Sequence, residues 1–167
     1  MSILRYPNKS LLTKTKEWDF SISRDELISH AVDMHEALSK SDRGVALAAN
    51  QVGKNIRMFV IHDEIASSLD IPTAIVNPRI TYSSSSKEEA KEGCLSFPNT
   101  FVPIKRSSNI GCEFFSVDGF IKHVDLSGFN ARVFQHECEH LDGKLFVDNL
   151  PRILRYQVIS KSLPRVR

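Results

Sequence analysis

The run from Gln135 to Gly143 constrains this chain more than any other, because it contains two histidines and a glutamate in the pattern H-E-x-x-H. His136 and His140 are four residues apart, so on an α-helix their imidazoles lie on one face, about one turn from each other. Such a pair can bind one metal ion, and Glu137 can then serve as a general base toward a water on that ion. We therefore expect a helix over residues 129–141 that carries a metal site.

The third ligand of that site is missing from the usual downstream position. The longer zinc-protease motif H-E-x-x-H-x-x-G-x-x-H matches Gly143 and then fails at Phe146, whose side chain cannot bind metal. No glutamate follows His140, and the acids that do are Asp142, which a helix would point away from the ion, and Asp148, which lies among loop-like residues. These observations favour an upstream ligand.

Cys94 is the strongest upstream candidate, within the run Glu92–Ser96. A thiolate binds iron(II) or zinc well beside imidazole, and Gly93 would let the backbone approach the ion closely. The other two cysteines are weaker candidates. Cys138 lies on a different face of the helix from the two histidines, and Cys112 lies in an alternating segment that predicts a buried strand residue.

Three motifs of the chain resemble those of the peptide deformylase family, metallohydrolases that remove the N-formyl group from newly made proteins. The motifs span Gly44–Gln51 (GVALAANQ), Glu92–Ser96 (EGCLS) and Gln135–Leu141 (QHECEHL), in the family's order, and Ile3–Pro7 resembles the family's N-terminal segment. The pattern H-E-x-x-H alone is only moderately specific, whereas EGCLS followed by QHExxHL is highly specific. The likeness covers residues 3–150.

The resemblance implies a catalytic metal site. Cys94, His136 and His140 would hold one divalent ion with a water in the fourth position, and three protein ligands with one open position are typical of catalytic metal. The family's natural ion is iron(II), with zinc, nickel or cobalt as substitutes, and two imidazoles with one thiolate suit iron(II) and zinc alike.

The same resemblance implies an amidase mechanism in which metal-bound hydroxide attacks the formyl carbon of N-formylmethionyl nascent peptides. Glu137 would take the proton of the water and then protonate the leaving amine, so that formate is released. The side-chain amide of Gln51 can donate a hydrogen bond to the oxyanion, and by resemblance the backbone N–H of Leu95 is the second donor.

The substrate's methionine side chain requires an apolar pocket beside the ion. By resemblance, its walls are Gly44, Val45, Ala46, Phe129 and Val133. Phe129 and Val133 have the same four-residue spacing as the two histidines and so extend the metal-facing side of the helix. The alternative, that these two are ordinary core residues, stays open.

The chain departs from the family pattern at two positions. Ala46 stands where the family usually has glycine, and its methyl group is expected to narrow the cleft or to restrict the backbone. Glu139 stands where the family usually has aspartate, which keeps the charge on a longer side chain. Because Glu139 is not at a ligand position, we expect an adjustment around the site and not a loss of metal.

The remaining sequence predicts an α+β protein. Ser23 and Glu26 have the spacing of a helix capping box, and the apolar positions over residues 27–38 keep helical spacing, so an N-terminal helix is expected to end before Gly44. Strands are expected over residues 56–61 and 74–82, and the second should lie at a sheet edge because it contains Pro78.

Further along, residues 110–117 and 120–126 predict a β-hairpin joined by the two-residue turn Asp118-Gly119. The four serines 83–86 predict a solvated turn, Gly143 a helix stop, and residues 151–162 a last amphipathic helix. We therefore expect antiparallel strands packed around a central metal-binding H-E-x-x-H helix, with an N-terminal helix and a short C-terminal helix.

Length and composition fit a single catalytic domain over residues 1–167, because a chain of 167 residues can bury a real core. The net charge of +2 is too small to indicate a nucleic-acid partner. No apolar run approaches the roughly 18 residues of a membrane helix. Three cysteines without a framework spacing fit a reducing compartment. We expect a monomer in a bacterial or bacterium-like cytoplasm, with no DNA or membrane partner; a processed organellar form would look the same.

The C-terminal segment is basic and permits two interpretations. It contains Arg152, Arg155, Lys161, Arg165 and Arg167, with no acid after Asp148. One interpretation is a solvated helix face. The other is contact with ribosomal RNA, as the family's C-terminal helix suggests. Four histidines lie outside the three motifs and are expected to be surface or core residues: His30, His35, His62 and His123.

Two other classes of protein share part of this pattern. A zinc endopeptidase has H-E-x-x-H but would not need Cys94 for its metal. A non-catalytic domain with a structural metal would tolerate the loss of Glu137 and Gln51, and it gives no reason for both to be present. Formate release from a formylated peptide, with and without Cys94, separates the three.

Overall fold

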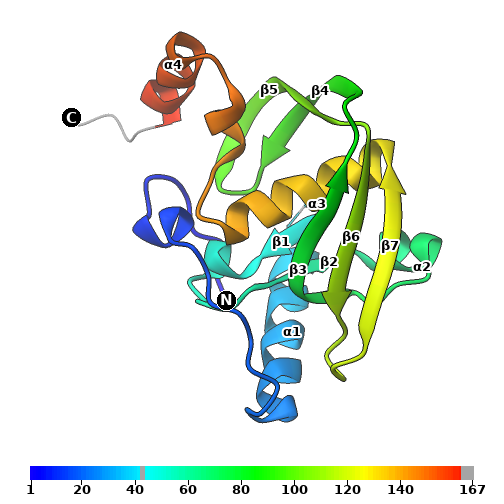
Figure 1. The fold of residues 1–167 in the computed structure, drawn as a ribbon. Coiled ribbons are helices and arrows are strands. Elements are labelled where there is room, and N and C mark those ends of the chain that lie inside the picture. Colours follow the sequence, from blue (N-terminus) through cyan, green and yellow to red (C-terminus); the bar gives the residue numbers. More distant parts are fainter. Residues whose placement is uncertain (42–43, 163–167) are drawn as a thin grey trace.

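The computed structural model describes residues 1–41 and 44–162, which form an α+β fold with antiparallel sheets (Figure 1). The α-helices are α1 (Arg24–Ser39), α2 (Asp63–Leu69), α3 (Gly128–Leu141) and α4 (Arg152–Ser162), with short 3-10 helices η1 (Lys9–Leu12), η2 (Ala49–Val52) and η3 (Phe146–Asn149). The strands are β1 (Ala46–Ala48), β2 (Met58–Ile61), β3 (Ala74–Ser83), β4 (Lys87–Cys94), β5 (Phe97–Ser107), β6 (Asn109–Phe115) and β7 (Ile121–Ser127). The predicted α+β class with antiparallel strands is confirmed.

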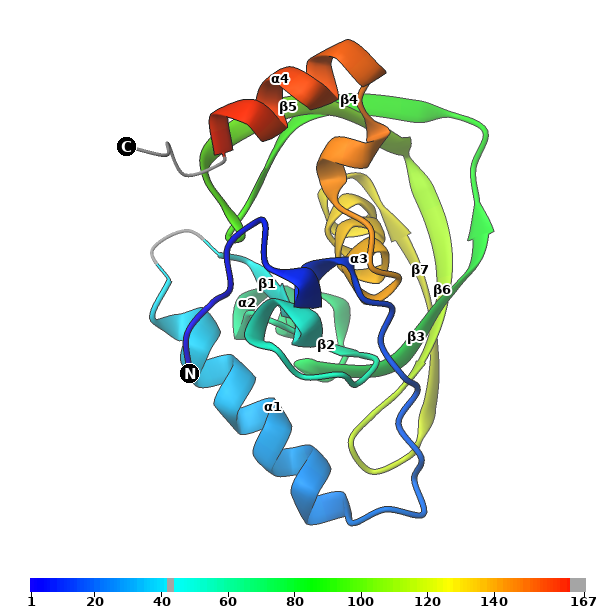
Figure 2. The same cartoon turned by 90° about the vertical axis from the view of Figure 1, so that its left-hand side faces the viewer.

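The strands form two sheets in which every pair is antiparallel. One sheet has five strands in the order β1-β2-β3-β6-β7, and the other is the β4-β5 hairpin. Helix α3 contacts strands of both sheets, and in Figure 2 it is seen nearly end-on between them. Helix α1 packs on β1 and β2, and α4 contacts β5 and η3.

The five-stranded sheet is covered on both faces, and the side chains of β2 show this clearly. In β2, Phe59 and Ile61 join the core cluster that includes α3, whereas Met58 and Val60 join the cluster that includes α1. Successive residues of a strand point to opposite faces. Because all four side chains are buried, both faces of the sheet must be covered here. A third cluster, around Phe146, lies between the β5 and η3 regions.

Strand β3 differs from its prediction as an edge strand. It lies inside the five-stranded sheet, between β2 and β6. The pairing with β6 shifts register between Val76 and Arg79, and Asn77 has a positive φ of 47°. Pro78 therefore lies in a bulge, where its missing N–H removes no ladder hydrogen bond. The proline indicated an irregularity, and the inference of an edge was wrong.

The β4-β5 hairpin was not predicted. Five successive residues of β4, Lys87–Lys91, are exposed, so the strand has no apolar alternation to indicate it. The serine run before it is only partly the solvated turn that was expected. Ser84 is buried, donates a hydrogen bond from its hydroxyl to the Ser86 carbonyl and accepts one from the Asn109 N–H.

Most other boundaries agree with the predictions. Helix α1 has Ser23 as its N-cap residue, but the Ser23 side chain makes no cap hydrogen bond, so the predicted capping box is wrong. The β6-β7 turn is longer than the predicted Asp118-Gly119 pair, because Ser116 and Phe120 already belong to it. Gly143, with a φ of 71°, follows α3 as expected.

Helix α4 also spans almost the predicted residues. Val158 and Ile159 are half-buried against the Phe146 cluster, whereas Ile153 and Tyr156 are exposed. Within residues 1–41 and 44–162, no helix is long and apolar enough to cross a membrane.

Candidate metal centre

Three side chains from two elements form a group that could hold a metal ion. Cys94 ends strand β4, and His136 and His140 lie one turn apart on α3. Their ligand atoms all lie within 4.8 Å of one another, and Cys94 Sγ is 3.2 Å from His140 Nε2. The structure thus brings together the three residues that the sequence singled out as ligands.

The ionisation of the two histidines also fits a cation. Burial lowers the pKa of His140 well below its usual range, which keeps this imidazole in the neutral form that metals bind. Burial alone would also lower the pKa of His136, but hydrogen bonds with Cys94 and Glu92 outweigh it and raise the pKa to about 10. The Cys94 sulfur and the Glu92 carboxylate therefore favour a positive charge at His136, whether that charge is a proton or a metal ion.

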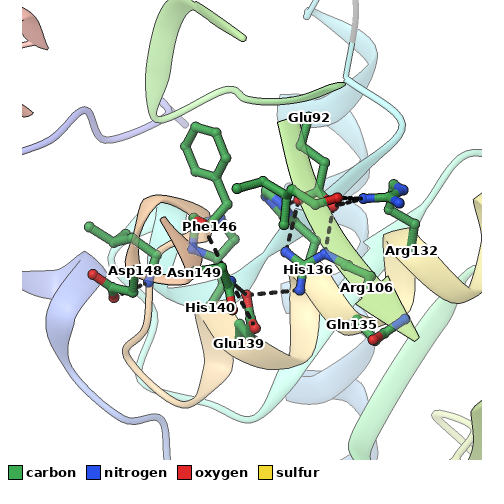
Figure 3. Close-up of polar contacts among 12 residues, drawn as sticks. Glu92, Arg106, Arg132, Gln135, His136, Glu139, His140, Phe146, Asp148 and Asn149 are labelled. Carbon is green, nitrogen blue, oxygen red and sulfur yellow. Dashed lines mark hydrogen bonds and ion pairs between the residues drawn. The ribbon is translucent and has the colours of Figure 1, made fainter. Parts of the chain in front are cut away.

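Glu92 sets the orientation of His136 (Figure 3). Its Oε2 lies 3.1 Å from His136 Nδ1, so Nε2 is left for the side that faces Cys94. Arg106 donates to both Glu92 oxygens at 2.6 and 2.8 Å, and Arg132 donates to Oε1 at 2.6 Å. Burial opposes ionisation of Glu92, but the His136 and Arg106 hydrogen bonds prevail and lower its pKa to about 2.

Glu137 is buried at 4% exposure beside these ligands. Its Oε2 has no hydrogen-bond partner among the described residues, and burial raises its pKa to about 7. A carboxyl group with this pKa can exchange a proton near neutral pH.

Gln51 reaches the site from η2 with its amide group held in one orientation. Its Oε1 accepts a hydrogen bond from the Ala48 N–H at 2.8 Å. Its Nε2 donates to Ser96 Oγ at 3.1 Å and lies 3.5 Å from Cys94 Sγ. The amide N–H₂ therefore faces the candidate metal centre.

Gly44 and Leu95 show why the first and second motifs fit closely together. A Cβ on Gly44 would lie 2.5 Å from Ser41 Oγ and 2.7 Å from a methyl group of Leu95, so the Leu95 side chain lies directly against this glycine. Among the described residues, the backbone N–H of Leu95 makes none of the turn or loop hydrogen bonds. A Cβ on Gly93 would lie 2.5 Å from the Phe101 ring, so this ring lies directly against the glycine.

A cleft of about 900 Å³ opens beside the candidate ligands. It is lined by the five predicted pocket residues, Gly44, Val45, Ala46, Phe129 and Val133, and by Gln51, Cys94, Leu95, His136 and Glu137. Ala46 and Val133 also belong to the buried core, whereas Phe129 is 59% exposed at the rim. The alternative that Phe129 and Val133 are ordinary core residues therefore holds in part for Val133, which is in the core and also lines the cleft. It does not hold for Phe129.

Phe146 lies next to the metal helix, although it cannot be a ligand. Its ring centroid is 5.7 Å from that of His136 and 5.4 Å from that of Phe97. A zinc protease has its third histidine ligand at this position. Here the position holds a phenylalanine whose ring packs on His136, the first histidine of the motif.

The isolated histidines take no part in this group. His30 contacts Lys54, His123 lies 3.6 Å from Glu113, and His62 precedes α2 as its N-cap residue. Across the described ranges 1–41 and 44–162, Cys94, His136 and His140 are the one cluster of three potential ligands that was found.

The sequence interpretation missed three residues around the ligands. It quoted Glu92 within a motif but gave it no role, and it did not single out Arg106 or Arg132. Nothing in the sequence around an arginine indicates that its side chain is buried. The role of these two arginines becomes clear only from the fold, which brings both to the Glu92 carboxylate.

Comparisons with known proteins find relatives over most of the chain. The family model described as Polypeptide deformylase matches residues 1–155. Peptide deformylase 2 of Vibrio vulnificus is 35% identical over 161 residues, which cover 96% of this chain and 92% of the relative. Peptide deformylase of Brucella suis is 36% identical over 137 residues, covering 82% and 78% of the two chains.

Solved structures show the same fold. Peptide deformylase of Thermus thermophilus superposes with a TM-score of 0.84 at 33% identity, over 96% of this chain and 93% of that one. Peptide deformylase of Ehrlichia chaffeensis, solved in complex with actinonin, gives a TM-score of 0.83 at 34% identity, over 96% and 94%.

Proposed function

The chain belongs to the polypeptide deformylase family, and we propose that it removes the formyl group from the N-terminal formylmethionine of nascent proteins and releases formate. Formyl removal from nascent peptides is the function of this family. The observation that carries the proposal is the Cys94, His136 and His140 group beside Glu137 in an open cleft.

Cys94, His136 and His140 are proposed as the ligands of one divalent ion. When bound, such an ion would polarise the formyl carbonyl and make water at the site more acidic. The donor set of one thiolate and two imidazoles suits iron(II), with zinc, nickel or cobalt as substitutes. Cys94 is half-buried, so we expect an iron form to lose activity in air by oxidation at sulfur and a nickel form to keep it.

Glu137 is proposed as the group that moves the proton. Its carboxylate takes a proton from the attacking water as the new C–O bond forms at the formyl carbon. It then gives that proton to the nitrogen of methionine as the C–N bond breaks, which yields formate and a free amine. A carboxyl whose pKa is raised to about 7 by burial suits both transfers near neutral pH.

Two N–H donors are proposed to stabilise the negative charge on the formyl oxygen. The first is the side-chain amide of Gln51, which its contacts with Ala48 and Ser96 hold in place. The second is the backbone N–H of Leu95, next to Cys94 in the chain. Donors that are oriented before the reaction need no rearrangement as charge develops on the oxygen.

The methionine side chain is proposed to lie in the apolar part of the cleft. Gly44, Val45 and Ala46 form one wall at the start of β1, and Phe129 and Val133 form the other on α3. The buried methyl group of Ala46 takes space that glycine would leave open. We therefore expect an Ala46→Gly variant to accept bulkier first residues more readily.

Residues 1–167 are proposed to act as one monomeric catalytic domain, with α3 as its central metal-binding helix that contacts both sheets. A nascent-chain substrate places this activity in a bacterial cytoplasm or in an organelle that starts its proteins with formylmethionine. We further propose that the exposed basic residues of α4 contact ribosomal RNA. Arg152 and Lys161 lie on that helix, Arg155 pairs with Asp148 at 2.7 Å, and Arg165 and Arg167 lie outside the described residues.

The reaction is tested with three peptides. Metal-loaded protein should release formate from formyl-Met-Ala-Ser and leave acetyl-Met-Ala-Ser intact. An unformylated peptide of the same sequence extended at both ends should not be cleaved internally. Internal cleavage without formate release would favour the endopeptidase instead.

A further inference from the structure

Glu139 touches the same buried arginine as Glu92. Arg106 Nη1 lies 3.0 Å from Glu139 Oε2, while its Nε lies 2.6 Å from Glu92 Oε1 (Figure 3). The Arg106 side chain is 3% exposed, so these two carboxylates take the place of water around it. A chain of contacts thus runs from Glu139 through Arg106 and Glu92 to His136.

The charges of this cluster balance only when Glu139 is counted. Arg106 and Arg132 both contact Glu92, which gives two positive groups around one negative group. Glu139 supplies the second negative charge. Without it, the buried cluster behind His136 would be net positive, and that charge would oppose a cation bound by His136 and draw Glu92 toward the arginines.

Asn149 braces Glu139 from the other side. Its side-chain Nδ2 lies 3.2 and 3.0 Å from the two Glu139 oxygens and 3.3 Å from the Phe146 carbonyl. Asn149 ends η3, the segment whose Phe146 ring packs on His136. Glu139 therefore joins the chain segment after α3 to the cluster that orients a metal ligand.

We propose that Glu139, braced by Asn149, is a positioning residue for metal retention. It holds Arg106 and neutralises the cluster, so that Glu92 stays on Nδ1 of His136 and Nε2 stays directed toward Cys94. This inference rests on the proposed metal site at Cys94, His136 and His140.

A merely structural ion pair would behave differently. If the Glu139–Arg106 pair only stabilised the fold, its loss would change unfolding and would not change how long the folded protein holds its metal. The distinguishing quantity is the rate at which zinc leaves the folded protein, because a positioning role changes this rate even where unfolding of the metal-free protein is unchanged.

The test measures zinc release to an excess of chelator, and urea unfolding of the metal-free protein, for four variants. Glu139→Gln removes the charge at nearly constant shape, Glu139→Asp keeps the charge, and Asn149→Ala removes the brace. Glu17→Gln is the control, since Glu17 pairs with the exposed Arg79 at 2.8 Å and belongs to no ion pair of the cluster.

We expect Glu139→Gln to release zinc about 10 times faster than the unchanged protein, the lower end of the loss in metal affinity found when direct partners of metal ligands are removed, because Glu139 acts through Arg106 and Glu92. Asn149→Ala should release it faster by a smaller factor, and Glu139→Asp and Glu17→Gln should stay close to the unchanged protein. Release by Glu139→Gln at the unchanged rate would overturn the proposal. If Glu139→Gln does not fold, unchanged release by Asn149→Ala overturns it.

Failure of the metal site itself would give another result. If the unchanged protein takes up no zinc, or Cys94→Ala holds zinc equally well, the proposed ligands are wrong. A different result is that the protein binds zinc only when Cys94 is present, with the Glu139 substitutions leaving the release rate unchanged. That result would contradict only the role of Glu139.

Discussion

Glu92 Oε2 lies 3.1 Å from Nδ1 of His136, and the same carboxylate accepts hydrogen bonds from two buried arginines. One acid therefore orients a candidate metal ligand and also joins the two arginines that link β4, β5 and α3. The candidate metal centre and the packing of the β4-β5 hairpin on α3 thus share one side chain.

Glu92→Ala should destabilise the metal-free protein strongly. The substitution leaves Arg106 and Arg132 buried without this carboxylate, which typically costs about 3–5 kcal/mol. Urea unfolding measures the effect, and Glu17→Gln, which breaks an ion pair whose side chains are 54% and 61% exposed, serves as the control. If Glu92→Ala lowers the free energy of unfolding no more than Glu17→Gln does, the cluster is not important for folding.

Glu137→Gln should keep its metal and lose most of its activity. Proton transfer by a positioned side chain contributes about 10²–10⁴-fold to rate, and glutamine keeps the shape without the proton. Metal analysis and formate release from formyl-Met-Ala-Ser are measured on the same sample. Full activity with bound metal would remove Glu137 from the mechanism.

The raised pKa of Glu137 also predicts how the metal-free protein responds to pH. Burial lifts this pKa from 4.5 to about 7, so the folded state favours the protonated acid. The resulting stability is fully present below pH 4.5 and is lost as pH rises through about 7. Between pH 4 and 8, the stability of the unchanged protein should fall by about 3 kcal/mol relative to Glu137→Gln. Parallel pH curves for the two proteins would contradict this assignment.

Gln51→Leu should slow the reaction without releasing the metal. Loss of one oriented donor to an oxyanion typically lowers kcat by about 10²–10³. The Ala48 N–H would also lose its acceptor, at a cost to folding of about 1–3 kcal/mol. Single-turnover kinetics on folded, metal-loaded protein separates the two effects, and an unchanged rate would rule out Gln51 as a donor.

The sequence was most informative where chemistry restricts residue type and spacing. His136 and His140 required a helix, and α3 begins at Gly128, one residue before the predicted start. Phe146 excluded the downstream ligand, and in the structure its ring packs on His136. Cys94 was found because a two-histidine helix needs a third ligand.

The sequence was least informative where tertiary structure overrides local preference. Pro78 is accommodated inside a sheet by a bulge at Asn77, which no local rule predicts. Strand β4 is exposed along Lys87–Lys91 and so lacks the apolar period that indicates strands. Arg106 and Arg132 lie 14 and 40 residues from Glu92, and only the fold shows that the three side chains meet.

If Cys94 completes a metal site that hydrolyses formyl groups, its loss should remove metal and activity together. The direct measurement is metal content together with formate release from formyl-Met-Ala-Ser, on protein prepared without oxygen. Cys112→Ala is the matched control, because Cys112 is a buried cysteine of the core and not a member of the ligand group. The unchanged protein and Cys112→Ala should hold metal and release formate, and Cys94→Ala should do neither. Metal retention and formate release by Cys94→Ala at the unchanged rate would exclude Cys94 as a ligand of the catalytic metal.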